Sequence, residues 1–209
     1  EAAGAGDLVV CDLPGDAGDP EEKILNLAGR KLAGLVEPGN LLAFLEGNGP
    51  KMEAVFHLGA VSSTTETDVD LILDTNFRLS IDIWSLCARH HIPLIYASSA
   101  ATYGDGSGGF DDNGSPDALA RLRPLNVYGW SKHLFDRWVV RQTAEGAPVP
   151  PQWAGLKFFN VYGPNEYHKG GQISVPLKNF REIEADGEAV LFKSHHLDYA
   201  DGGQMRDFV

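Results

Sequence analysis

Short runs of apolar and β-branched residues alternate along this chain with longer segments of helical periodicity. Four of these runs are expected to form strands: residues 7–13, 53–60, 92–99 and 154–163. Nearly unbroken apolar strands are typical of a parallel sheet that is covered by helices on both faces. The alternation therefore predicts an α/β fold with a doubly wound parallel sheet.

The segments between these runs supply the expected helices. Residues 68–91 repeat apolar side chains at about the 3.6-residue period of a core-facing helix: Val69, Leu73, Phe77, Ile81 and Trp84. Shorter helices are expected at residues 39–48 and 131–142. Residues 104–117 are rich in glycine, aspartate and serine, which indicates a surface loop.

Composition narrows the class of function. A net charge of −12 argues against nucleic acid as a partner, because binding a phosphate backbone calls for a basic surface. No apolar run reaches the ~20 residues that a membrane-spanning helix needs, and the first residues lack the pattern of a secretory signal. The two cysteines offer no disulfide framework, which favours the cytoplasm. The seven histidines lack metal-site spacing, so no metal is expected.

Polar residues and glycine directly follow the apolar runs, where ligands bind in open parallel sheets. Asp12 closes the first run, and an acid there would take the ribose hydroxyls of a dinucleotide, although a turn aspartate would look the same. Gly59 would let a nucleotide approach the backbone, or would simply form a tight turn. Asn76 would be a buried amide that needs a ligand or a loop backbone as its partner.

A serine, a tyrosine and a lysine complete this set. Ser98 and Ser99 end the third run, while Tyr128 and Lys132 are four residues apart after the loop. That spacing places two side chains on one helix face and is common by chance. Tyrosine is a poor base at neutral pH, and a nearby ammonium favours its deprotonated form. The serine would hold a substrate oxygen while the tyrosine takes its proton and a nicotinamide takes the hydride.

These residues lie in motifs that resemble the extended short-chain dehydrogenase/reductase family: HLGAVSSTTE, YASSAATYG, PLNVYGWSK, FNVYGPNEYHKG and RDFV. Within it, GAVSSTTE and YGPNEYHKG are similar to the epimerases of an ADP-activated heptose. The resemblance implies inversion at C6 through a 6-keto intermediate, with recycled NADP, to supply the heptose of the lipopolysaccharide core. Asp12 would favour NAD, whereas Lys23 would pair with a 2′-phosphate, so both cofactors stay open.

The resemblance also implies a role for each matching residue. Catalysis is assigned to Ser99, Tyr128, Lys132 and, as a second acid/base, Lys169. The cofactor would be held by Asp12, Leu13, Lys23, Leu58, Gly59, Ala60, Val61, Ser62, Asn76, Lys132 and Val161. The ADP-sugar would contact Ser99, Asn160, Gly171, Lys178, Phe192, Lys193, Ser194 and Arg206.

A Rossmann-like dinucleotide-binding domain is expected at residues 1–165, and the start of a substrate-binding portion at residues 166–209. The family opens with a strand and a glycine-rich turn, whereas GAGD at residues 4–7 is too short and precedes the wrong strand. We therefore expect a fragment that lacks the first βα unit and most of the C-terminal portion. Activity, and a homo-oligomeric state, would belong to the longer protein.

Two alternatives stay open. A UDP- or dTDP-sugar 4-epimerase or 4,6-dehydratase would share the same serine, tyrosine and lysine. A non-catalytic nucleotide-binding module would keep the fold without turnover. No nucleic acid or membrane partner is expected in any of these cases.

Overall fold

Contacts within the chain divide it into two compact units. The computed structural model describes three stretches: residues 6–13, 20–194 and 197–203. The first unit contains Glu1–Asp12 and Leu32–Phe158, and the second contains Leu13–Lys31 and Phe159–Val209. The binding roles expected for residues 1–165 and 166–209 stay predictions.

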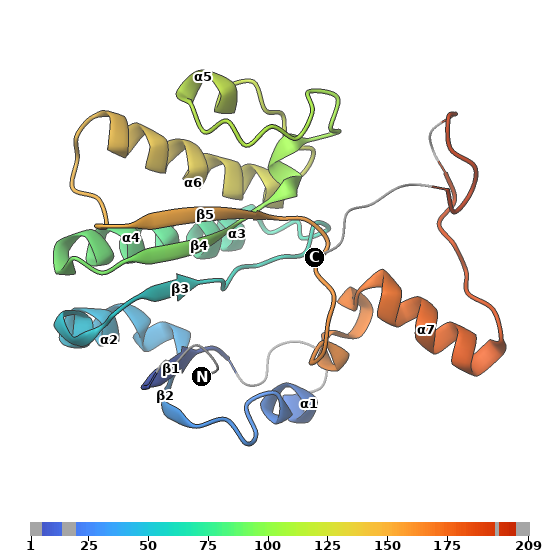
Figure 1. Cartoon of the computed structure of the whole chain (residues 1–209), viewed down its shortest axis with the longest axis horizontal. Coiled ribbons are helices and arrows are strands. Elements are labelled where there is room, and N and C mark those ends of the chain that lie inside the picture. Colours follow the sequence, from blue (N-terminus) through green and yellow to red (C-terminus); the bar gives the residue numbers. More distant parts are fainter. Residues whose placement is uncertain (1–5, 14–19, 195–196, 204–209) are drawn as a thin grey trace. The chain divides into compact units, whose positions relative to one another are not determined.

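The strands of the first unit form two parallel sheets (Figure 1). β1 (Leu8–Cys11) pairs with β2 (Leu32–Val36). β3 (Val55–His57), β4 (Leu94–Ser99) and β5 (Trp153–Phe158) follow one another in the second sheet, in the order β3-β4-β5. Every pairing is parallel, which confirms the predicted α/β class. The four expected strands are all present, and each is shorter than its apolar run.

The long helix expected at residues 68–91 is present, with one irregular stretch. It comprises α3 (Val69–Ile72), the π-helical turn η3 (Leu73–Arg78) and α4 (Leu79–His90). The side chain of Asp68 accepts a hydrogen bond from the backbone N–H of Leu71 and so caps the helix start. Such π-helical turns are rare and are often found at functional sites.

The other two expected helices are α2 (Leu41–Asn48) and α6 (Val127–Ala144). Among the described residues, three further helices were not predicted: α1 (Pro20–Leu25), α5 (Pro116–Leu119) and α7 (Val175–Asp186). The short helical turns are η1 (Pro38–Asn40), η2 (Gly49–Lys51), η4 (Ala100–Tyr103) and η5 (Tyr167–Gln172). No helix in the described part of the chain combines the length and the apolar character needed to span a bilayer.

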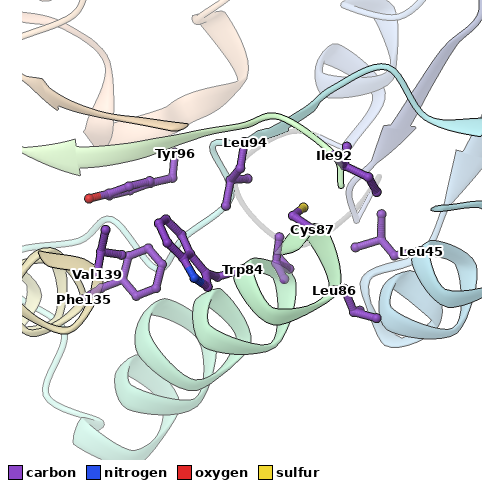
Figure 2. Close-up of a cluster of buried hydrophobic side chains, with 10 residues drawn as sticks. Leu45, Trp84, Leu86, Cys87, Ile92, Leu94, Tyr96, Phe135 and Val139 are labelled. Carbon is purple, nitrogen blue, oxygen red and sulfur yellow. The ribbon is translucent and has the colours of Figure 1, made fainter. Parts of the chain in front are cut away.

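The core of the first unit lies between β4 and the helices α4 and α6 (Figure 2). Trp84 on α4 is 1% exposed, and its ring meets the edge or face of Phe135 and Trp138 from α6 and Trp153 from β5. Such aromatic contacts add to the stability gained from burying their large surfaces. This packing fastens α6 to α4 and to the sheet.

Candidate active site

Ser99 is the last residue of β4 and caps the turn η4 that follows. Its Oγ accepts a hydrogen bond from the backbone N–H of Ala101 at 3.1 Å. The neighbouring Ser98 points to the other face of the strand, as alternation requires, and donates to Asp136 Oδ2 at 2.7 Å. Because the Ser98 hydroxyl is committed to Asp136, Ser99 is the serine available for the predicted chemistry.

Tyr128 and Lys132 lie on the first two turns of α6. The side chain of Asn126 accepts from the backbone N–H of Gly129 at 2.8 Å and fixes the helix start. A Cβ on Gly129 would lie 2.8 Å from the carbonyl oxygen of Ala101. Only glycine therefore lets the first turn of α6 approach η4, directly after Ser99. This close approach brings the helix start that carries Tyr128 against the end of β4.

Lys132 is almost fully buried, with 5% of its surface exposed. Burial lowers the pKa of Lys132 to about 8, and the negative charge of Asp136 opposes that effect. At neutral pH the amine is therefore mostly protonated. It can supply the positive charge that a deprotonated tyrosine one helical turn away requires.

His57, at the end of β3, is buried near Lys132. Burial lowers its pKa to about 4, and the charge of Lys132 adds to the effect, so the ring is neutral at physiological pH. Its Nε2 lies 2.9 Å from Ser80 Oγ, and Ser80 donates its own proton to the carbonyl oxygen of Asn76. His57 must therefore carry its proton on Nε2 and donate it to Ser80.

Asn76 lies in the π-helical turn η3 and is 1% exposed. Its Oδ1 accepts from the backbone N–H of Val61 at 2.8 Å, and its Nδ2 donates to the carbonyl oxygen of Val61 at 2.9 Å. Nδ2 also donates to Ser131 Oγ at 3.1 Å. Both amide protons are thus used within the protein. Asn76 ties the loop after β3 to α6, between Tyr128 and Lys132, and a direct cofactor contact from it stays a prediction.

The loop after β3 holds the predicted cofactor residues Leu58, Gly59, Ala60, Val61 and Ser62. Leu58 is 56% exposed, and a Cβ added to Gly59 would meet open space. Asp12 follows β1 and is exposed, and its backbone N–H donates to Val36. The loop after β3 offers exposed backbone groups, and Ser99 and Lys132 offer a hydroxyl and an ammonium. These donors fit the ribose and amide groups of a nicotinamide cofactor.

The remaining predicted residues belong to the second unit, and Arg206 lies outside the described residues. Lys23 Nζ donates to the carbonyl oxygen of Leu13 at 2.5 Å. Lys178 Nζ lies 5.7 Å from the centre of the Phe192 ring, so two predicted substrate residues contact each other. The roles expected for Asn160, Val161, Gly171, Lys193 and Ser194 stay predictions.

Lys169 lies in the turn η5, next to Gly170, whose positive φ of 53° favours glycine. The buried Glu166 fastens this turn to α7, because it accepts from both the backbone N–H and the hydroxyl of Ser174 at 2.7 Å. Burial alone would raise the pKa of Glu166. The hydrogen bonds from Ser174 and Gly163 and the charge of Lys169 outweigh burial and lower that pKa.

Sequence reasoning missed three residues that support these positions: Asp136, Lys157 and Glu166. The sequence signal for Asp136 was an acid four residues after Lys132. The signal for Lys157 was a lysine inside the apolar run of β5. Glu166 stands inside the motif YGPNEYHKG, but its role as an anchor depends on the fold of η5 and α7.

Comparisons with known proteins give a consistent picture. The model of the NAD dependent epimerase/dehydratase family matches residues 30–209. The chain is 46% identical over 191 residues to the ADP-L-glycero-D-manno-heptose-6-epimerase of Fusobacterium nucleatum, covering 90% of this chain and 56% of that relative. It is also 46% identical over 209 residues to the protein of that name from Nitratidesulfovibrio vulgaris, covering 99% and 61%.

A solved structure agrees with these relatives. The crystal structure of the Helicobacter pylori ADP-L-glycero-D-manno-heptose-6-epimerase is 29% identical, with a TM-score of 0.71. The match covers 89% of this chain and 55% of that one. The fold is therefore the predicted Rossmann-like one, and the chain spans 56–61% of the length of the curated relatives it matches.

Proposed function

The chain belongs to the NAD dependent epimerase/dehydratase family, and from that premise we propose that the complete protein is an ADP-heptose 6-epimerase. It converts ADP-D-glycero-β-D-manno-heptose to the L-glycero form and supplies the heptose of the lipopolysaccharide core. The packing of the start of α6, which carries Tyr128 and Lys132, against the turn that follows Ser99 is the observation that supports the proposal. The choice of sugar rests on the names of the relatives.

In this proposal the side chains of the first unit move the proton of the sugar hydroxyl at C6. Ser99 holds that oxygen by a hydrogen bond, and Tyr128 takes its proton. The buried ammonium of Lys132 stabilises the tyrosinate that accepts this proton. When bound, a nicotinamide cofactor supplies the hydride acceptor for C6 and later the hydride donor.

We assign cofactor binding to the loop after β3, to Lys132, and to Asp12, Leu13, Lys23 and Val161. We propose NADP, with Lys23 as the partner of its 2′-phosphate, and NAD is the alternative because Asp12 could take the ribose hydroxyls. Lys23 already donates to the carbonyl of Leu13, which keeps its ammonium beside the residue that follows Asp12. Substrate contacts are assigned to Asn160, Gly171, Lys178, Phe192, Lys193, Ser194 and Arg206.

Inversion needs the hydride to return to the opposite face of C6, so the sugar must bind in two orientations. Two orientations call for an acid/base on each side of the sugar, and we assign the second role to Lys169. Its place beside Gly170, in a turn that the buried Glu166 anchors, gives this exposed lysine a defined backbone position.

A panel of nucleotide sugars tests the proposal. The complete protein, loaded with NADP or NAD, is incubated separately with the ADP-D-glycero-heptose, with UDP-glucose and with a dTDP-hexose. Proton NMR then reports the configuration at each carbon. We expect inversion of the heptose at C6 with no net reduction of the cofactor. Inversion of a UDP-sugar at C4 with the heptose unchanged would establish the 4-epimerase instead, and cofactor binding without any conversion would establish the non-catalytic module.

A further inference from the structure

A buried ion pair joins α6, the helix that carries Tyr128 and Lys132, to β5. Asp136 on α6 and Lys157 on β5 are joined by a contact of 2.9 Å between Nζ and Oδ2. The side chains of Asp136 and Lys157 are only 7% and 18% exposed. A buried pair of this kind gains little net stability over apolar residues, so its presence calls for another explanation.

The pair is the centre of a hydrogen-bond network at the end of β4. Asp136 accepts from Tyr96 Oη at 3.1 Å and from Ser98 Oγ at 2.7 Å. Lys157 Nζ donates to Thr102 Oγ1 at 2.7 Å, and Thr102 donates in turn to the carbonyl oxygen of Ser99 at 2.8 Å. The carboxylate therefore holds the residue before Ser99, and the lysine holds the backbone of Ser99 itself.

Asp136 also stands four residues after Lys132, on the same face of α6. Two ionisable side chains are coupled to Lys132: His57 from β3, whose pKa the charge of Lys132 lowers, and Asp136, whose charge opposes the effect of burial on Lys132. The groups that face Asp136 are Lys157 from β5, Tyr96 from β4, Tyr103 from η4, and Lys132 and His133 from α6. Of these two groups, Asp136 is thus the one that favours the ammonium form of Lys132.

We propose that Asp136 is a positioning residue that keeps Lys132 protonated and, together with Lys157, fixes the placement of Ser99. The inference rests on the proposed function, because it assigns a purpose to a charged Lys132 and a fixed Ser99. Lys157 is assigned two tasks: it neutralises the buried carboxylate of Asp136, and it holds the end of β4 through Thr102.

Three variants of the complete protein separate charge from structure: Asp136→Asn, Lys157→Met and the double variant. The readout is the NMR titration of Lys132 in protein labelled with ¹³C at lysine Cε. The Lys132 signal is identified as the one that is missing from the spectrum of Lys132→Arg. Loss of the carboxylate should lower the titration midpoint of Lys132 by about one pH unit in Asp136→Asn and in the double variant. Lys157→Met keeps the carboxylate, so there the midpoint should not fall.

The double variant is the control for loss of folding in Asp136→Asn. Asp136→Asn leaves Lys157 buried and unpaired, which is strongly destabilising, whereas the double variant removes both charges. An unchanged Lys132 midpoint in the double variant would overturn the proposal. The titration needs no turnover, so a wild-type protein that inverts no heptose would contradict the proposed function alone.

The pH profile of activity provides a second readout that a merely structural role would not move. If protonated Lys132 is required, a lower midpoint moves the alkaline limb of the profile to lower pH in Asp136→Asn. Asp136→Glu returns a carboxylate and should return the limb toward that of the wild type. A purely structural network would instead lower activity equally at every pH and leave the limb in place, which would contradict the role assigned to Asp136.

Discussion

At the scale of single residues, two buried histidines of the first unit have the same charge state and different hydrogen bonding. Burial lowers the pKa of both His57 and His133 to about 4. His57 is bonded to Ser80, whereas neither ring nitrogen of His133 has a hydrogen-bond partner among the described residues. A buried polar group without a partner costs stability, so His133 should be a weak point of the fold.

This difference predicts opposite effects of two matched substitutions. His133→Leu should raise the free energy of unfolding by about 1 kcal/mol, because it removes an unsatisfied imidazole. His57→Leu should lower it by about 1 kcal/mol or more, because it breaks the bond to Ser80. Urea denaturation of both variants measures the difference. Equal destabilisation by the two would contradict the account.

The same lowered pKa values set the dependence of stability on pH. An unfolded histidine binds its proton near pH 6.5, whereas these two do so in the folded state only near pH 4. Their contribution is therefore fully present above pH 6.5 and is lost as the pH falls from 6.5 toward 4. We expect the His133→Leu variant to lose less free energy of unfolding over that range than the wild type.

The residues of the candidate site differed in how far sequence could predict them. Tyr128 and Lys132 lie on one helix face as their spacing indicates, because four residues make about one turn. The partner of Asn76 was left open between a ligand and a loop, and the structure shows hydrogen bonds to the loop backbone at Val61 and to Ser131 of α6. The pairing of Asp136 with Lys157 could not be predicted, since it joins α6 to β5 across the tertiary structure.

At the scale of elements, the approach of α6 to η4 decides the geometry of the site. The approach depends on Gly129, where a Cβ would press on the carbonyl of Ala101. Gly129→Ala should therefore cost about 1–3 kcal/mol of stability and displace Tyr128 from Ser99, which lowers turnover as well. Denaturation and the rate of C6 inversion measure the two effects.

Gly47 in α2 is the matched control, because a Cβ added there would meet open space. Gly47→Ala should be neutral or stabilising by up to about 1 kcal/mol, since alanine favours a helix interior over glycine. If Gly129→Ala and Gly47→Ala behave alike, the close approach of α6 to η4 has no energetic consequence.

Elements were predictable where their apolar pattern was strong. The long helix at residues 68–91 was confirmed, but its π-helical turn η3 has no sequence signal. Strand β2 was missed because Ala33 and Gly34 dilute its apolar pattern. Helix α7 was missed too, although Leu177, Phe180 and Ile183 recur at helical spacing in it.

At the scale of the whole molecule, the proposed chemistry divides between the two units. Ser99, Tyr128 and Lys132 belong to the first unit, and Lys169 belongs to the second. Lys169→Met should abolish epimerisation, while Tyr128 still serves the half-reaction of one heptose configuration. Supplying the D- and L-glycero nucleotides separately measures each half-reaction. Epimerisation at the wild-type rate would remove Lys169 from the mechanism.

The most direct test of the account is the rate of C6 inversion in Tyr128→Phe, measured by NMR on the complete protein beside the wild type. The substitution keeps the ring and removes the oxygen that we assign to proton transfer. We predict that the wild type inverts ADP-D-glycero-β-D-manno-heptose and that the variant is slower by about 10²–10⁴-fold. A variant with near-normal turnover would show that Tyr128 and Lys132 are only two side chains on one face of a helix.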